Sequence, residues 1–182
     1  MSQPKDPNIL KLENVRLSYP QLFVAKAMED GKEPRYSASF LLDKKQHATL
    51  IAHIEKLTER VALDQFKKKV KLNRVPLRDG NEKEDKEGYG DEVMFINATN
   101  TKRPVVVDRD LTPLTADDSK PYAGCVVNAT VRFFAFDHPT GGKGVSASLR
   151  AIQFVKDGES FGAGPVSADE EFESLSKDAD DY

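Results

Sequence analysis

The sequence predicts a mainly β fold, a small mixed sheet or barrel with one or two helices. Two observations support this prediction. About five or six short stretches have the alternating or β-branched pattern of strands, and turn sequences rich in Gly, Pro, Asp and Asn separate them. A stretch in the first half has apolar residues at the spacing of a helix. The chain has 182 residues, which is enough for one domain with a buried core.

The first two predicted strands form a hairpin. From Ile9 to Tyr19 apolar and polar residues are mixed at short spacing, and Val15, Leu17 and Tyr19 alternate with polar residues as in a strand. Pro20 is expected to end this strand. Residues 29–34 (EDGKEP) have the composition of a turn, and residues 35–42 (RYSASFLL) are the expected partner strand.

A helix is predicted after this hairpin, over residues 44–60, with Asp43 as its N-cap. One apolar stripe supports it: Leu50, Ile51, Ile54, Leu57 and Val61. Phe66 and the three lysines 67–69 follow, either on this helix or on a short second one. Cations near a helix C-terminus interact favourably with the helix dipole, which explains these lysines without a ligand.

The second half of the chain is predicted to be rich in strands. Residues 73–92 are highly charged and glycine-bearing, so we expect a long exposed loop there. The strands expected after it cover residues 93–98, 103–107, 123–136 and 144–156. The turn between the last two strands contains Gly, Pro and Asp.

The charges divide the chain into a basic body and an acidic tail. Residues 157–182 hold nine Asp/Glu and one lysine, a net charge of −8, whereas residues 1–156 hold 26 Lys/Arg against 21 Asp/Glu, or +5. We expect a flexible N-terminus over 1–8, a folded domain over 9–156 and a disordered tail over 157–182. A basic body suits a polyanion, and a tethered acidic segment can compete for the same surface or bind a basic partner.

Composition favours a cytosolic protein. No apolar run approaches the roughly 18–20 residues of a membrane span, and the first residues, MSQPKDP, lack the apolar stretch of a signal peptide. The single cysteine, Cys125, excludes an internal disulfide framework and fits a reducing compartment.

The two strands over 123–136 and 144–156 have unlike faces, because side chains alternate along a strand. One face is apolar and core-like: Val127, Ala129, Val131, Phe133 and Ala135, with Val145, Ala147, Leu149 and Ala151 on the partner. The other face mixes arginines, small polar groups and rings: Asn128, Thr130, Arg132, Phe134 and Phe136, with Ser146, Ser148, Arg150, Ile152 and Phe154 on the partner.

This mixed face has the groups that bind single-stranded nucleic acid. Arginines contact phosphates, and rings stack on bases of any sequence at about 1–3 kcal/mol per base. If Arg132 and Arg150 were directly opposed, their like charges would favour an anion between them. The alternative is that Phe134, Phe136 and Phe154 pack under the helix while the arginines are solvated.

Other residues are candidates for the same groove. The basic ones are Arg16, Arg35, Lys102, Arg103 and Lys143. The aromatic ones stand at strand starts or in loops: Tyr36, Tyr89 and Tyr122.

The sequence offers little for catalysis, and we predict no metal and no cofactor. The three histidines are scattered, and Gly141-Gly142-Lys143-Gly144 lacks the spacing of a phosphate-binding loop. Asp108, Asp110 and Glu84 leave a metal-dependent nuclease as an alternative, because such enzymes use carboxylates that converge on ions about 3.5–4 Å apart. Glu84 is expected in a loop, which favours a binder over an enzyme.

Several sequence blocks resemble a known family. They are residues 14–20 (NVRLSYP), Leu22-Phe23, Gly31 with residues 36–42 (YSASFLL), residues 128–132 (NATVR) and residues 144–147 (GVSA). Together they are similar to a bacteriophage family of single-stranded DNA-binding proteins, formerly catalogued as a phage domain of unknown function. The resemblance covers most of residues 9–156.

The resemblance implies an OB-fold, a five-stranded Greek-key barrel with a helix between its third and fourth strands and one face for oligonucleotides. The predicted helix follows only two evident strands, so either a strand within 9–30 is missed or the topology is elaborated. The resemblance also implies a non-enzymatic phage protein that coats and protects single-stranded DNA in replication or recombination, in the cytoplasm of the infected bacterium.

The acidic tail is similar to the tails of podovirus-type and bacterial single-strand binders, although it ends in tyrosine where those end in phenylalanine. The resemblance implies that it recruits a replication protein, such as a polymerase, helicase or primase, and competes with DNA. Its expected partner-binding residues are Asp169, Glu170, Glu171, Phe172, Glu173, Asp180, Asp181 and Tyr182.

The centre of the DNA site is expected at Arg132, Arg150, Phe134 and Phe136, with phosphate contacts from Arg16, Arg35, Lys102 and Arg103. Affinity should fall as salt rises, because bound cations release counterions. A strand-annealing protein that forms rings or filaments is a second alternative. A homo-oligomer is compatible with the sequence.

Overall fold

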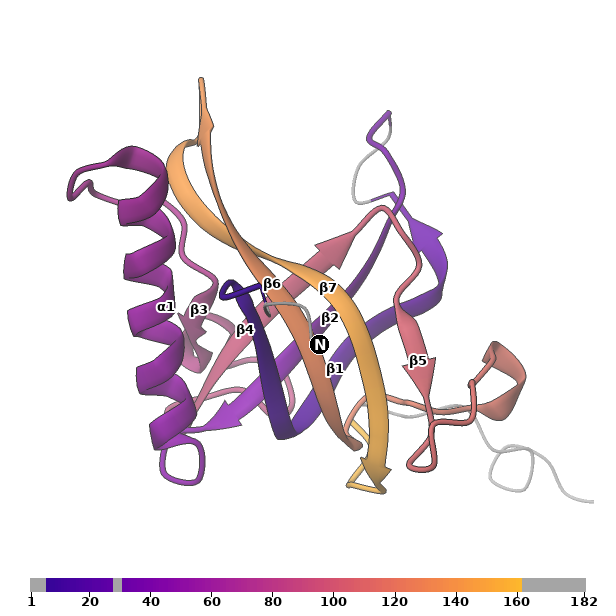
Figure 1. Cartoon of the computed structure of the whole chain (residues 1–182). Helices are drawn as coiled ribbons and strands as arrows, with labels where there is room; N and C mark the ends of the chain where they lie inside the picture. Colours follow the sequence, from indigo (N-terminus) through magenta and orange to yellow (C-terminus); the bar gives the residue numbers. More distant parts are fainter. Residues whose placement is uncertain (1–5, 28–30, 162–182) are drawn as a thin grey trace, which may run out of the picture.

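The computed structural model describes residues 6–27 and 31–161, and a closed β-barrel lies at its centre (Figure 1). The barrel strands are β1 (Ile9–Lys26), β2 (Arg35–Asp43), β4 (Val93–Asn100), β6 (Val126–His138) and β7 (Gly142–Lys156). They pair antiparallel in the order β4-β2-β1-β6-β7, and a parallel pairing of β4 with β7 closes the ring. The predicted mainly β barrel is confirmed.

The remaining elements lie around this barrel. The helix α1 (Ala48–Phe66) stands beside it, on the side of β3 and β4 in Figure 1. β3 (Leu77–Asp79) pairs with β4, and β5 (Val105–Val107) pairs in parallel with β7. The 3₁₀ helices η1 (Gly80–Lys83) and η2 (Ala116–Asp118) lie in connections. In the part of the chain that the structure describes, no helix has the length and apolar content to cross a membrane.

Inward side chains from all five strands fill the barrel. The fully buried ones include Val15, Leu17, Phe40, Leu42, Ile96, Val127, Val131, Phe133, Val145 and Leu149. Removing apolar surface from water stabilises the fold by about 25 cal/mol per Å². The predicted apolar face of the last two strands is therefore confirmed from 127 to 133 and from 145 to 149.

β1 does not end at Pro20, contrary to the prediction, and continues to Lys26. Ser18 pairs with Ser39 and Gln21 with Ser37, so β1 uses three residue steps where β2 uses two. The extra residue makes a bulge, and Tyr19 there has a positive φ of 47°. A bulge tolerates proline because its residues leave the hydrogen-bonded ladder, where proline has no N–H to donate.

The helix begins later and ends later than predicted. Asp43 serves the turn before it, where its carboxylate accepts the backbone N–H groups of Lys45 and Gln46 at 2.9 and 2.8 Å. The predicted stripe is confirmed, since Ile54, Leu57 and Val61 are buried. In chain order α1 lies between the second and third barrel strands. The topology is thus elaborated, and no additional strand lies among the described residues of 9–30.

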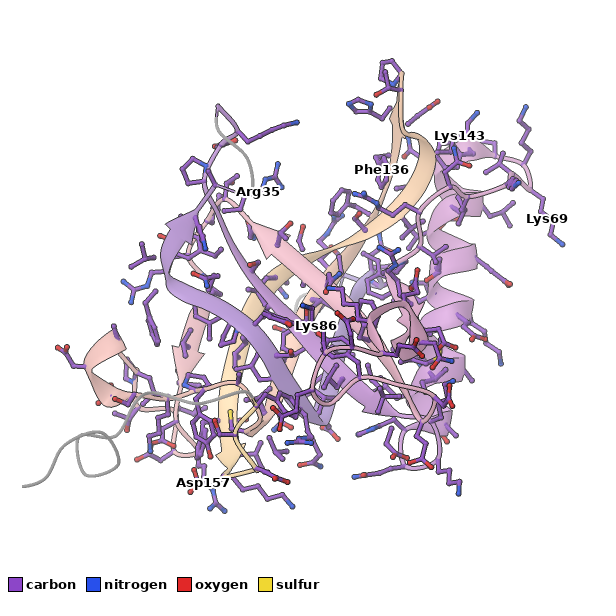
Figure 2. The ribbon with its side chains drawn as sticks, turned by 180° about the vertical axis from the view of Figure 1, so that it is seen from behind. Arg35, Lys69, Lys86, Phe136, Lys143 and Asp157 are labelled. Carbon is purple, nitrogen blue, oxygen red and sulfur yellow. The ribbon has the colours of Figure 1, made fainter. Side chains whose placement is uncertain are left out.

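The segment 73–92 is not the simple exposed loop that its charge predicted. It contains β3 and η1 and covers the outer wall of β1, β2 and β4, in front of the barrel in Figure 2. Leu41 and Phe95 point outward from their strands and are nevertheless buried beneath it. Charged residues of this segment face solvent, while its single ring, Tyr89, packs against Phe95 on the wall. The high average charge of the segment therefore hid its packing from the sequence analysis.

The outer face of β7 changes side at a bulge, which the sequence analysis did not anticipate. Thr130 pairs with Ala151 and Val131 with Leu149, so Arg150 is the extra residue. After this bulge, the β7 residues that the alternation predicted to face outward face inward instead. Ile152 and Phe154, predicted on the mixed outer face, are therefore buried in the core, and Ala151, predicted inside, is only half-buried.

Candidate nucleic-acid interface

The outer face of β6 has the predicted composition and is open to solvent. Arg132 is exposed, and Phe134 and Phe136 are half-buried. The two rings are neighbours, with centroids 6.5 Å apart. The alternative was that Phe134, Phe136 and Phe154 all pack in the core. Of the three, Phe154 alone is buried there.

Arg132 and Arg150 lie on the same side of the β6–β7 hairpin, although they are not directly opposed. Arg132 pairs with Ser148, and Arg150 follows in the bulge. An anion lies beside both: Arg132 Nε is 2.8 Å from the Oδ2 atom of Asp6. The hydrogen bond from Arg132, then that from the Asn8 N–H, holds the pKa of Asp6 below its usual value, and the charge of Arg150 adds to this.

Sequence reasoning missed Asp6, which falls within the predicted flexible N-terminus. Residues 6–8 are instead hydrogen-bonded to the body. The carbonyl oxygen of Asn8 accepts the N–H of Phe133 at 2.9 Å, and Arg60 on α1 donates to the carbonyl of Pro7 at 2.5 Å. No periodic pattern marks such a short segment, so its position depends on the strand and helix that it contacts.

A hollow of about 560 Å³ lies next to Arg150, where β4 leaves the barrel and β5 joins β7. It brings Arg150 together with two other predicted phosphate contacts, Lys102 and Arg103. Asn100 fixes this corner, because it donates to the Leu149 carbonyl at 2.9 Å and accepts the Lys102 N–H at 3.0 Å. Three cations therefore converge on one shallow site.

Three further candidates lie at the edges of this surface. Tyr36 pairs with Asn100, so it stands beside the hollow, and the exposed Arg35 precedes it as the first residue of β2 (Figure 2). Lys143 lies at the far end of the β6–β7 hairpin, where its ammonium is 5.6 Å from the centre of the Phe66 ring.

Arg16 and Tyr122 are not brought to this surface. Arg16 donates to the carbonyl oxygens of Glu159 and Gly124 at 2.7 and 3.3 Å, and its guanidinium lies 4.1 Å from the centre of the Phe161 ring. The hydroxyl of Tyr122 donates to Asp157 at 2.7 Å. Asp157 lies at the opposite end of the molecule from Arg35 (Figure 2). Both residues thus anchor the segment that leads into the acidic tail.

Tyr89 belongs to segment 73–92 and packs on the wall of β1, β2 and β4 that this segment covers, which we call the covered wall. Its hydroxyl donates to the Ser18 Oγ at 3.1 Å, and its ring meets Phe95 edge-on with centroids 5.2 Å apart. Burial raises the pKa of Tyr89. The predicted tail residues, 169–173 and 180–182, lie outside the described residues.

The carboxylates of the nuclease alternative have local roles. Asp108 forms an ion pair with Lys120 at 2.9 Å, and Asp110 accepts the N–H of Thr112 at 3.1 Å in a turn. Within residues 6–27 and 31–161 no group of three or more His, Cys, Asp or Glu is arranged to hold a metal ion. Cys125 is buried, and burial raises the pKa of its thiol to about 11.

A family model described as the ssDNA-binding protein of Enterobacter phage Enc34 matches residues 8–182. The chain belongs to this family. Protein p50 of Acyrthosiphon pisum secondary endosymbiont phage 1 is 42% identical over 177 residues, which are 92% of this chain and 94% of that protein. Family membership confirms the resemblance on which the OB-fold prediction was based.

Solved structures agree with this assignment. The Enc34 protein in complex with ssDNA has a TM-score of 0.77 and 28% identity, and covers 85% of this chain and 90% of its own. A C-terminal truncation of that protein has a TM-score of 0.75, with 27% identity over 85% of this chain and 88% of its own. Bacteriophage T7 gp2.5, a single-stranded DNA-binding protein, has a TM-score of 0.57 at 14% identity, over 91% of this chain and 97% of its own, and shares the fold. The OB-fold prediction is confirmed.

Proposed function

We propose that this protein binds single-stranded DNA without sequence preference, on the outer face of β6 and β7 and in the adjoining hollow. The observation that carries the proposal is that Arg150, Lys102 and Arg103 line one hollow, and that Arg132 and two partly exposed rings follow on the adjoining face of β6. The cations bind phosphates and release counterions, and the rings of Phe134 and Phe136 stack on bases. Since a solved relative of the same fold is described in complex with ssDNA, this ligand is the one to test.

In this proposal Asp6 occupies the position of a phosphate in the free protein. Its carboxylate accepts from Arg132 and lies in the field of Arg150. A DNA phosphate carries the same charge and offers the same acceptor geometry to arginine. Binding then exchanges one anion for another, so Arg132 keeps a partner in both states.

The proposed role is coating and protection of single strands during phage replication or recombination, in the cytoplasm of the infected host, without catalysis. Binding of this kind needs no bond to be made or broken. The anchored carboxylates Asp108 and Asp110 are engaged in an ion pair and a turn, which favours a binder over the nuclease alternative.

The acidic tail is proposed to recruit a replication protein and to compete with DNA. Its charge of −8 suits both roles, and Arg16 and Tyr122 anchor residues 157–161 from which it continues. The docking residues proposed within it are Asp169, Glu170, Glu171, Phe172, Glu173, Asp180, Asp181 and Tyr182.

A fluorescence titration of labelled ssDNA and of duplex with the same sequence, at two salt concentrations, tests the proposal. We expect tighter binding to the single strand and weaker binding at higher salt. Equal affinity for both forms, or no binding at low salt, would overturn it. Incubation of the labelled strand with Mg²⁺ or Mn²⁺ separates the nuclease alternative, which alone predicts degradation.

A further inference from the structure

A second basic surface lies beyond the proposed DNA site, at the C-terminal end of α1. We call it the basic lobe: Lys67, Lys68, Lys69, Lys71 and Arg74. All five side chains are exposed, and no ion pair joins any of them to another described residue. The lobe therefore has an uncompensated positive charge that is available to a polyanion.

The basic lobe is fixed to the β6–β7 hairpin by backbone hydrogen bonds. Asn73 N–H donates to the Lys143 carbonyl at 2.8 Å, and the Val145 N–H donates to the Arg74 carbonyl at 3.0 Å. The Asn73 side chain also donates to the Gly141 carbonyl at 3.2 Å. These contacts hold the lysine-rich segment beside the strands that carry Arg132 and Arg150.

The row of rings on β6 leads directly to the lobe. Phe136 pairs with Gly144, and a Cβ at Gly144 would lie 2.5 Å from the Phe136 ring and 3.0 Å from the Arg74 carbonyl oxygen. Glycine at 144 thus leaves the space that the Phe136 ring occupies next to Arg74. Figure 2 shows Phe136, Lys143 and Lys69 in the same corner of the molecule.

We infer that the basic lobe binds the sugar-phosphate backbone of the same single strand after it passes Phe134 and Phe136. This inference rests on the proposed function and extends its site. The lobe contacts backbone and not bases, because its five residues have no rings and the Phe66 ring that precedes them is engaged by the Lys143 ammonium. The cations and rings follow one another along the surface, from Lys102 through Arg150 and the two phenylalanines to Lys69. Such a row suits a linear polyanion better than a compact partner.

The helix dipole does not require these cations at the lobe. α1 ends at Phe66, and the residues after it are closed by a Lys67 N–H bond to the Leu63 carbonyl at 2.8 Å, with Lys67 at a φ of 61°. Lys68, Lys69 and Lys71 lie past this closure and are exposed, so the helix dipole stabilises each of them by about 0.3–1 kcal/mol at most. Their replacement should leave the fold intact.

The test compares two triple variants of the full chain. Lys68→Gln, Lys69→Gln and Lys71→Gln remove three charges from the lobe. Lys45→Gln, Lys56→Gln and Lys86→Gln remove three exposed charges elsewhere. Each is titrated with dT oligonucleotides of about 6 and about 20 nucleotides, which bracket the usual site of an OB-fold.

We expect the lobe variant to lose about tenfold or more in affinity for the long oligonucleotide at low salt. Its salt slope should fall by about 2, because each contact to a single strand contributes about 0.7. Affinity for the short oligonucleotide and the melting temperature should not change, and the control variant should match the wild type. A lobe variant that binds the long oligonucleotide as the wild type does would overturn the inference.

Deletion of residues 165–182 distinguishes the other occupant, the acidic tail. If the lobe held the tail, the lysine changes would release it to compete with DNA, and their effect would vanish in the shortened chain. That result would also overturn the inference. Failure of the wild type to bind even the short oligonucleotide would instead refute the proposed function.

Discussion

Two walls of the barrel contain the same kinds of residue and differ in what those residues contact. On the wall of β1, β2 and β4, the rings of Tyr19, Tyr89 and Phe95 face one another under the Lys83 ammonium, which lies 5.2–5.7 Å from each ring centre. On the β6–β7 wall, Phe134 and Phe136 are half-buried and lie beside Arg132 and Arg150. Among the described residues, these arginines share one acidic neighbour, Asp6.

We infer from the difference that rings and cations are available to a ligand only where the protein leaves them without internal partners. Tyr89 is half-buried like Phe134 and Phe136, but its hydroxyl is hydrogen-bonded to Ser18 and its ring packs edge-on against Phe95. Arg16 is another case, because two carbonyls and the Phe161 ring use its guanidinium. Composition alone would count all of these residues as candidates for DNA.

The largest effect is expected from removing both arginines of the open wall. Arg132→Ala with Arg150→Ala should weaken ssDNA binding about 10- to 100-fold at low salt for every sequence, and lower the salt slope by about 1.4. Titrations with dT and mixed-sequence oligonucleotides measure this. Lys83→Ala on the covered wall is the control and should leave affinity unchanged; a loss limited to certain sequences would contradict a phosphate role.

Removing one ring should have the next largest effect. Phe134→Ala should lose about 1–3 kcal/mol of binding free energy, the value of one stacked base, with little change in melting temperature. Tyr89→Phe on the covered wall should instead lower stability and leave DNA affinity unchanged. Loss of the hydrogen bond from its hydroxyl to Ser18 costs about 1 kcal/mol of folding free energy. A large fall in melting temperature for Phe134→Ala would mean that its ring is a core residue after all.

Deleting residues 165–182 should tighten ssDNA binding by about two- to tenfold, because a tethered competing polyanion is removed. The gain should shrink as salt rises, since screening weakens the competitor. Parallel titrations of the full and shortened chains measure it. Unchanged or weaker affinity of the shortened chain would exclude tail competition.

The smallest effect is expected from Asp6→Asn, which should tighten binding a few-fold, because Arg132 and Arg150 no longer have a neighbouring carboxylate. Asp6 has a pKa below its usual value, so its negative charge persists at neutral pH and is lost only as the pH falls through that lowered pKa. At pH values below that pKa, the ssDNA affinity of the wild type should approach that of the Asp6→Asn variant. Asp85→Asn, on the other wall, is the control; weaker binding by Asp6→Asn would mean that Asp6 positions Arg132 for DNA.

Local pattern was enough to predict every strand except β3 and the second half of β1, together with the buried stripe of α1 and the alternation that places Arg132, Phe134 and Phe136 on one face. These features follow from the two-residue period of a strand and the 3.6-residue period of a helix, which each segment carries in its own sequence. The family blocks added the barrel.

Tertiary structure decided the features that depend on a partner segment. The bulge at Arg150 exists because β6 and β7 have unequal numbers of residues between their pairs, and it moved Ile152 and Phe154 inside. Contacts distant in sequence likewise placed Asp6 beside Arg132 and the Tyr89 hydroxyl against Ser18. Pairing between segments is not encoded in the period of either one, so only the folded chain determines which predicted residues share a surface.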